Sequence, residues 1–235
     1  DAGFETGLGD EGGFAPNLKS SEEALKMLQK AIIKAGYKPG KDIAIAFDAA
    51  ASSFYNKEDG KYHFEDHVWD GNQMLDYYEK LLKEFPEIVS CEDPFDENDW
   101  TNFEKFTERF GSTHQVVADD NVCTNPELVR KAIEDKLCNA ILIKLNQIGT
   151  ITETLETIRL ARKNGMTTMV SHRSGETGDT FIADFTVATN GGQLKSGAPA
   201  RSERVEKYNR LLEIEEQIGV QNERLNHFPN DVRLD

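Results

Sequence analysis

Cysteine is scarce in this sequence, and long apolar runs are missing from it. The three cysteines, Cys91, Cys123 and Cys138, are scattered and form no CxxC pair. An odd, scattered set is typical of a reducing compartment, so we predict the cytoplasm. With no cysteine cluster and no His-x₃-His pair, the sequence lacks the spacing of a zinc site. No apolar run approaches the length of a membrane span, and the first residues show no signal-peptide pattern.

Positive charge is also in short supply. Lysine and arginine number 27 against 42 aspartates and glutamates, which gives a net charge of −15. That balance argues against a general nucleic-acid surface and suits divalent cations, although most acidic proteins are simply soluble. Hydrophobic residues make up 38% and charged residues 29% of the 235 positions, which indicates a globular chain. The length allows one large domain or two small ones.

Six short apolar segments recur along the chain, and each ends at a polar residue. We predict that they are β-strands, because short apolar runs are typical of strands buried in a parallel sheet. The strands and the residues that follow them are Ile43–Phe47 before Asp48, Glu87–Cys91 before Glu92, Gln115–Ala118 before Asp119, Ala140–Ile143 before Lys144, Thr167–Ser171 before His172, and Gly192–Leu194 before Lys195. From Glu92 onward the polar residues recur every 23 to 28 positions, which is about one βα unit.

Helical patterns fill the intervals between these strands. Ser20 and Glu23 match a capping box, and Asn125 with Pro126 opens a later helix. Further helices are predicted around Met74–Leu82, Phe103–Phe110, Leu155–Ala161, Phe181–Ala188 and Ser202–Ile218. The first βα interval is 44 residues long, so it should carry an insertion, which we place in the polar Asn56–Asp70 segment.

Strands that alternate with helices predict an α/β fold with a parallel sheet and right-handed crossovers. An open, doubly wound sheet would spread the six polar residues along one edge, whereas a (β/α)₈ barrel would aim them at one point. Three carboxylates, two lysines and a histidine form a single site only in the barrel, which we therefore predict. A closed barrel needs eight strands, and we expect the first two to precede Asp1.

The order of the strand-end residues favours chemistry over simple capping. Taken singly, a carboxylate there can be an N-cap, His172 a half-buried core residue, and Lys195 a rim partner of Glu203. Taken together, three successive strands end in acids and the next three in Lys, His and Lys. Three converging carboxylates suit Mg²⁺. Two adjacent lysines would lower each other's pKa, so that one of them can act as a base that removes a proton alpha to a carboxylate.

A glycine-rich loop near the start carries two further acids. Gly9–Pro16 reads GDEGGFAP, with glycines on both sides of Asp10 and Glu11. Glycine lets a backbone approach a ligand closely, although an ordinary solvated turn has the same composition.

Several of these stretches together closely resemble the enolases, the phosphopyruvate hydratases of glycolysis. The matching stretches are Gly9–Asn17 (GDEGGFAPN), Glu92–Phe95 (EDPF), Ala118–Asn125 (ADDNVCTN), Ile143–Thr150 (IKLNQIGT), Val170–Thr177 (VSHRSGET) and Lys195–Arg204 (KSGAPARSER). They run nearly from end to end. The resemblance implies that residues 1–235 form the C-terminal catalytic barrel domain of an enolase, with the smaller N-terminal α+β domain and the first barrel strands outside this chain.

The resemblance also implies a metal site and a substrate site. Asp48, Glu92 and Asp119 would hold Mg²⁺, with Asp120 and Asn146 orienting the metal and the base. The residues that would bind the substrate, 2-phosphoglycerate or phosphoenolpyruvate, are His172, Arg173, Ser174 and Lys195.

The same resemblance assigns chemical roles. Lys144 would take the C2 proton, and Glu11 would help the C3 hydroxyl to leave as water. Lys195 would pair with the substrate carboxylate, and Arg173 with Ser174 would bind the phosphate. Enolases usually carry Glu-Thr-Glu-Asp where this chain has Glu176–Asp179 (ETGD), which affects loop geometry rather than these roles.

The reaction expected of the whole protein is the Mg²⁺-dependent, reversible dehydration of 2-phosphoglycerate, and we expect the 235 residues alone to be inactive. Enolases are typically homodimers or octamers. One alternative is another enzyme of the enolase superfamily, acting on a different carboxylate. A second is a non-catalytic form at the cell surface or secreted, because Phe54–Lys57 and Gly60–Tyr62 loosely resemble a plasminogen-binding segment.

Overall fold

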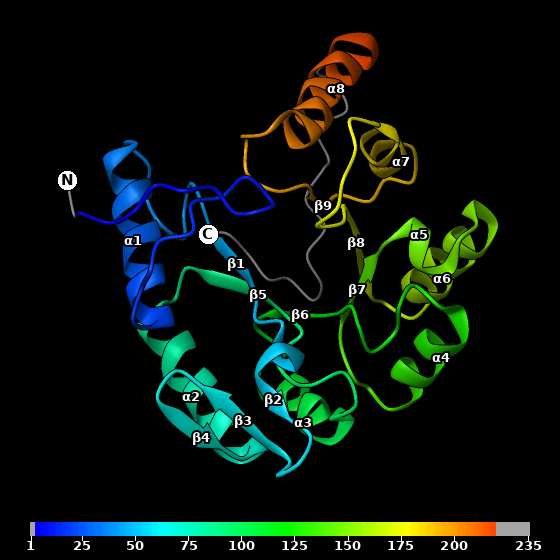
Figure 1. Cartoon of the computed structure of the whole chain (residues 1–235). Coiled ribbons are helices and arrows are strands. Elements are labelled where there is room, and N and C mark those ends of the chain that lie inside the picture. Colours follow the sequence, from blue (N-terminus) through cyan, green and yellow to red (C-terminus); the bar gives the residue numbers. More distant parts are fainter. Residues whose placement is uncertain (1–2, 220–235) are drawn as a thin grey trace.

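The computed structural model describes residues 3–219 and shows a curved parallel sheet with helices outside it (Figure 1). The sheet has six strands, and all neighbouring strands are parallel. In spatial order they are β1 (Ile45–Asp48), β5 (Ile88–Glu92), β6 (Gln115–Ala118), β7 (Ala140–Ile143), β8 (Thr167–Ser171) and β9 (Leu194–Lys195). The six predicted strands are confirmed, with bounds that shift by no more than two residues.

The strand order shows that the sheet is the wall of a barrel. The spatial order follows the chain without a reversal, whereas a doubly wound sheet has a point where the order reverses. The two edge strands also approach each other, because Lys195 on β9 donates a hydrogen bond of 2.8 Å to Asp48 on β1. In a flat sheet, six strands would hold those ends about 24 Å apart, further than a lysine side chain reaches. The prediction of a barrel over an open sheet is confirmed.

Helices connect the strands and cover the outer face of the sheet (Figure 1). They are α1 (Ser21–Lys34), α2 (Gly71–Glu84), α3 (Trp100–Phe110), α4 (Pro126–Glu134), α6 (Ile151–Lys163), α7 (Phe181–Ala188) and α8 (Ser202–Ile218). Ser20 and Asn125 cap their helices through the side chain, as predicted, but the Glu23 carboxylate accepts from the N–H of Lys19 rather than that of Ser20, so the capping box is only half formed. The short helices η1 (Ala51–Phe54) and α5 (Leu145–Ile148) were not predicted. No helix within residues 3–219 is long and apolar enough to cross a bilayer.

The predicted insertion after β1 is a small antiparallel sheet. Its strands are β2 (Tyr55–Asn56), β3 (Lys61–Phe64) and β4 (His67–Trp69). Tyr62 anchors it to the barrel, since its ring is fully buried, packs against Phe95, and donates a 2.7 Å hydrogen bond to Asp99.

The middle strands are buried on both faces, and alternate residues belong to two separate apolar clusters. Every residue of β6 and β7 is buried. Ile141 and Ile143 belong to the main cluster that the helices share, whereas Ala140 and Leu142 form a second, small cluster with Val117. This period of two continues past the strand ends. It places residue 144 on the same side as Ala140 and Leu142, and residue 119 on the same side as Val117.

Candidate active site

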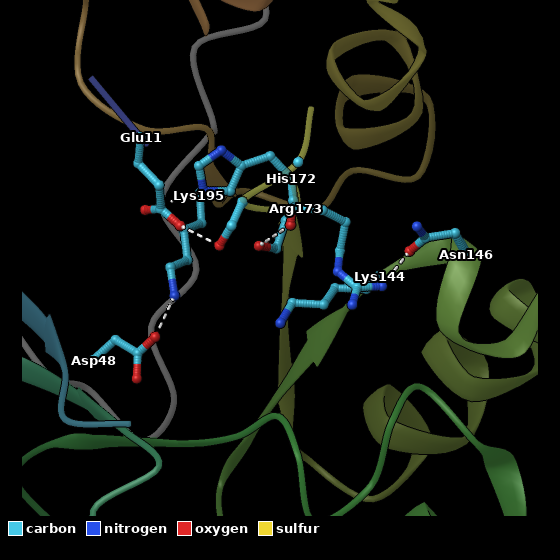
Figure 2. Close-up of a pocket in the computed structure, with 10 residues that line it drawn as sticks. Glu11, Asp48, Lys144, Asn146, His172, Arg173 and Lys195 are labelled. Carbon is cyan, nitrogen blue, oxygen red and sulfur yellow. Dashed lines mark hydrogen bonds and ion pairs between the residues drawn. The ribbon is translucent and has the colours of Figure 1, made fainter. Parts of the chain in front are cut away.

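A pocket of about 390 Å³ lies at the carboxyl ends of the strands, where parallel α/β barrels carry their functional groups (Figure 2). Seven of the nine predicted site residues line it: Glu11, Asp48, Lys144, His172, Arg173, Ser174 and Lys195. The other two predicted residues, Glu92 and Asp119, contact the lysines of the pocket. Residues from positions 11 to 195 therefore meet at one mouth.

The lysines of the pocket bridge the carboxylates. Lys195 Nζ lies 2.8 Å from Asp48 Oδ2 and 2.8 Å from Glu92 Oε1. Lys144 Nζ donates to Asp119 Oδ2. Figure 2 shows the bond between Lys195 and Asp48 as a dashed line. Each predicted metal-binding carboxylate is thus paired with an ammonium group.

The expectation that the lysines lower each other's pKa is wrong for Lys195. Burial alone would lower its pKa, but the nearby carboxylates of Glu92 and Asp48 outweigh that effect and raise the pKa above its usual value. The rim partner weighed for Lys195, Glu203, is not among its ion pairs within residues 3–219.

The carboxylates of the pocket favour a bound cation. Burial and the nearby Asp48 carboxylate together raise the pKa of Glu92 to about 8, although Lys195 opposes them. A second cation would relieve this repulsion between buried acids. Carboxylate oxygens from adjacent strands are the hard ligands that Mg²⁺ prefers. Asp48, Glu92 and Asp119 therefore fit a divalent metal by their donor type and charge.

Asp93 is a buried acid that the sequence analysis passed over. Within residues 3–219, Asp93, Asp119 and Asp120 are the set of carboxylates whose oxygens approach within 4.8 Å of one another. Asp93 accepts hydrogen bonds from the backbone N–H groups of Asp119 (2.9 Å) and Asp120 (3.1 Å). Both of its oxygens are therefore engaged in holding the loop that presents Asp119. Its position directly after Glu92 in the EDPF stretch was the available signal.

Glu11 reaches the pocket because its loop packs tightly against the loop after β9. Gly12 has a φ of +80°, and a Cβ there would lie 2.4 Å from the carbonyl oxygen of Ala200. The N–H of Ala198 also donates a 2.8 Å hydrogen bond to the carbonyl of Glu11. Only glycine fits such a left-handed, close approach at low cost. Gly12 thus serves the packing that places Glu11.

The predicted phosphate-binding side chains lie on the loop after β8. Arg173 Nη1 donates a 2.8 Å hydrogen bond to Asn146 Oδ1, and Ser174 Oγ donates to Glu11 Oε1 at 3.4 Å (Figure 2). Asn146 was expected to orient the base, but its hydrogen bond orients Arg173 instead. His172 is 2% exposed, and its Nε2 lies 3.4 Å from Glu11 Oε2.

A buried threonine links the base candidate to the metal-site loop. Thr124 is fully buried and has a φ of +57°. Its hydroxyl accepts from the N–H of Lys144 (2.8 Å) and donates to Gln147 Oε1 (2.9 Å). Gln147 Nε2 then donates to Asp119 Oδ1 at 3.3 Å. Sequence reasoning missed this network, because a threonine after a strand has no signal of its own.

Two buried cations on α8 hold the loops around the pocket. Arg204 is 1% exposed and donates to the carbonyl oxygens of Arg173 (2.7 Å), Ser174 (2.7 Å) and Asp10 (3.1 Å). Lys207 is fully buried and donates to the carbonyl of Thr177. Neither was predicted, although Arg204 closes the KSGAPARSER stretch.

Chemically, the pocket combines three functions. Asp48, Glu92 and Asp119 offer carboxylate oxygens of the kind that a divalent cation binds, although the set whose oxygens lie within 4.8 Å of one another in residues 3–219 is Asp93, Asp119 and Asp120. Lys144 contacts Asp119 and can exchange a proton, and Arg173 with Ser174 offers donors to an anionic group. Such a set suits a small, multiply charged carboxylate.

The comparison with known proteins matches this geometry. The family model described as "Enolase, C-terminal TIM barrel domain" matches residues 2–226. The chain is 89% identical over 235 residues to "Enolase 2" of Lactobacillus johnsonii, 71% to "Enolase 1" of Lactobacillus gasseri and 68% to "Enolase" of Lactobacillus helveticus. Each alignment covers 100% of this chain and 55% of the relative, so the chain spans about half the length of these relatives.

Proposed function

Because this chain belongs to the enolase family, we propose that the protein containing it is a lyase that reversibly dehydrates 2-phospho-D-glycerate to phosphoenolpyruvate in glycolysis. The single observation that carries the proposal is the pocket itself, in which two lysines and three carboxylates from five strands meet. We also propose Mg²⁺ as the metal, the cytoplasm as the compartment and a homodimer or octamer as the assembly, because these accompany the family.

In this proposal Asp48, Glu92 and Asp119 hold the metal, which supplies a positive charge next to the substrate carboxylate. Lys195 donates to the same carboxylate and stabilises the negative charge that grows there. Its raised pKa suits this role, since it keeps the ammonium charged.

Lys144 acts as the base. It takes the proton from C2 of the substrate, and the electron pair of the C–H bond moves into the carboxylate. The charge then returns to form the C2–C3 double bond as the C3–oxygen bond breaks. A proton delivered at Glu11 turns the departing hydroxide into water, so atoms and charge balance.

Arg173 and Ser174 hold the phosphate in the pocket. Asn146 fixes the Arg173 guanidinium through the 2.8 Å hydrogen bond, so less conformational freedom is lost when the arginine binds an anion. This phosphate requirement separates the proposal from another enzyme of the superfamily. A panel of carboxylates with and without phosphate tests it, and turnover independent of phosphate would favour the alternative enzyme.

The central test is Lys144→Ala in the full-length protein. General base catalysis contributes roughly 10²–10⁴-fold, so we expect kcat to fall by about that factor. Lys41→Ala is the matched control, because Lys41 is exposed and lies outside the pocket. Activity of Lys144→Ala within about tenfold of wild type would remove the base assignment.

We further propose that residues 1–235 alone do not turn over substrate, because the relatives contain nearly as much chain again. Measurable turnover by the isolated 235 residues would contradict this proposal.

The segment that resembles a plasminogen-binding motif lies in the η1–β3 insertion. Its Tyr62 is buried in the core, and Lys57 and Lys61 are exposed, as on an ordinary hairpin. We propose no binding function for it.

A further inference from the structure

Arg204 is a fully buried guanidinium that is held by neutral acceptors. It is 1% exposed, and within residues 3–219 no carboxylate lies at ion-pair distance from it. Its Nη1 contacts His172 Nδ1 at 2.5 Å, and its remaining bonds go to carbonyl oxygens of the pocket loops. Burying a charge is costly unless hydrogen bonds compensate for it. The contact with His172 is the only one of these bonds that reaches a ring able to change its protonation.

The contact determines which ring nitrogen of His172 carries the proton. An arginine guanidinium has only donors and stays protonated, so His172 Nδ1 must be the acceptor. A neutral imidazole that accepts at Nδ1 carries its proton on Nε2. That Nε2 faces Glu11 Oε2 at 3.4 Å. Burial lowers the pKa of His172 and Arg204 lowers it further, while Glu11 opposes them, which agrees with a neutral ring.

The surrounding packing keeps the ring in this orientation. Gly197, with a φ of +79°, lies against both partners, since a Cβ there would stand 3.0 Å from Arg204 Cδ and 3.2 Å from His172 Cε1. The same Cβ would lie 2.6 Å from the carbonyl of Glu11. A flipped ring would present a carbon to the guanidinium and lose the hydrogen bond. The three residues therefore form one packed unit next to the pocket.

We propose that Arg204 is a positioning residue that fixes His172 as the neutral Nε2–H tautomer, so that the imidazole presents a hydrogen-bond donor to Glu11 and the pocket. The consequence for catalysis rests on the proposed function, because it assigns Glu11 to departure of the C3 hydroxyl. A proton at Nε2 attracts the Glu11 carboxylate, which lies 3.4 Å away without a formed hydrogen bond, whereas a bare Nε2 lone pair would repel it.

The tautomer can be read directly by ¹⁵N NMR of the full-length protein labelled at histidine. The His172 signal is assigned by its loss in His172→Gln. We expect the wild-type ring to be protonated at Nε2 and not at Nδ1. In Arg204→Met we expect the Nδ1–H or the doubly protonated form to appear, because no obligate donor remains at Nδ1. Arg204→Lys should restore the wild-type pattern, since an ammonium is also only a donor.

Lys207→Met is the matched control. Lys207 is also fully buried on α8, and it donates to the carbonyl oxygens of Thr177 and Glu203. Lys207→Met should lower the stability of the protein as Arg204→Met does, but it should leave His172 in the wild-type tautomer. The inference is overturned if Arg204→Met keeps the wild-type tautomer, or if Lys207→Met changes it equally.

Kinetics separate this inference from the proposed function. Loss of such a supporting partner typically costs 10–100-fold in activity, so we expect Arg204→Met to lower kcat by that factor with a smaller change in KM. Arg204→Lys should recover part of it. If Arg204→Met changes the tautomer but the wild-type protein does not dehydrate 2-phosphoglycerate, the proposed function alone is rejected. An unchanged tautomer in an active enzyme would reject the role of Arg204 alone.

Discussion

Replacing Asp93 should loosen the loop that presents Asp119. The Asp93 side chain is buried, and its two oxygens accept from two successive backbone N–H groups, at 2.9 and 3.1 Å. Hydrogen bonds to a charged group contribute about 1.5–3 kcal/mol each, and a buried N–H left unpaired costs about 1–3 kcal/mol. Against this, burial of Asp93 raises the pKa of its carboxyl to about 7, so ionising it in place is costly. We therefore expect Asp93→Ala to lose about 3 kcal/mol in the free energy of unfolding.

Asp93→Asn is the more informative variant. Asp93 has a φ of +41°, a left-handed conformation that asparagine tolerates and alanine adopts at a cost of roughly 1–2 kcal/mol. Asparagine keeps one acceptor for one of the two N–H groups and turns its amide N–H toward the other. We expect a loss of about 1 kcal/mol, with the fold intact. Mg²⁺ affinity should fall by about tenfold, since Asp119 loses its support.

The assay is urea unfolding of the full-length protein, followed by circular dichroism, together with calorimetric titration of Mg²⁺. Asp66→Ala is the control, because Asp66 is exposed and its carboxylate has no hydrogen-bond partner within residues 3–219. Surface substitutions of this kind usually change stability by less than about 0.5 kcal/mol. The reasoning fails if Asp93→Asn and Asp93→Ala both unfold at the midpoint of the control and bind Mg²⁺ as wild type does.

Two further predictions concern the loops and helices around the pocket. Gly12→Ala should lower the free energy of unfolding by at least about 1 kcal/mol and lower activity, because the added Cβ would meet the carbonyl of Ala200. Gly13→Ala is the control in the same loop, because no atom lies within 4 Å of a Cβ added there. It should be near neutral in thermal unfolding and turnover assays. Asp184→Asn should lower the free energy of unfolding by about 1 kcal/mol or less at pH 7, because Arg210 holds Asp184 through paired hydrogen bonds and lowers its pKa. This difference in unfolding free energy is fully present above the ordinary carboxyl pKa and should vanish as the pH falls through the lowered pKa of Asp184. Urea unfolding at several pH values measures it, and a difference that persists below the lowered pKa would contradict the prediction.

Strand positions and the convergence of the site were predictable from the sequence because both follow from periodicity. An apolar run such as Ala140–Ile143 can only be a buried strand in this pattern, and the period of two carries on to Lys144. Because every strand is parallel, all of their carboxyl ends lie at one edge. Once the barrel was chosen over the open sheet, residues as distant as Asp48 and Lys195 had to approach each other.

Contacts that depend on loop geometry were not predictable. The two N–H bonds to Asp93 depend on the left-handed φ of +41° at Asp93 and on the turn at Asp119 and Asp120, which no residue type announces. The direction of the pKa shift of Lys195 was predicted wrongly, because the sequence shows that two lysines converge but not that Glu92 and Asp48 both lie 2.8 Å from one of them. The sum of the local charges decided the direction of the shift.

Helix α8 shows why the missed residues belong to the pocket rather than to the core. Its length was predicted from an amphipathic pattern, yet its buried residues are Arg204, Lys207 and Ile214, of which only one is apolar. A helix that needed only to cover the sheet would bury leucines at those positions. Two cations there are favourable because carbonyl oxygens of Arg173, Ser174 and Thr177 accept from them and because the Glu176 carboxylate lies 3.7 Å from Lys207 Nζ. The loop after β8 therefore takes its shape from α8, and a leucine at either cationic position should leave those carbonyl oxygens unpaired and move the loop that carries Arg173.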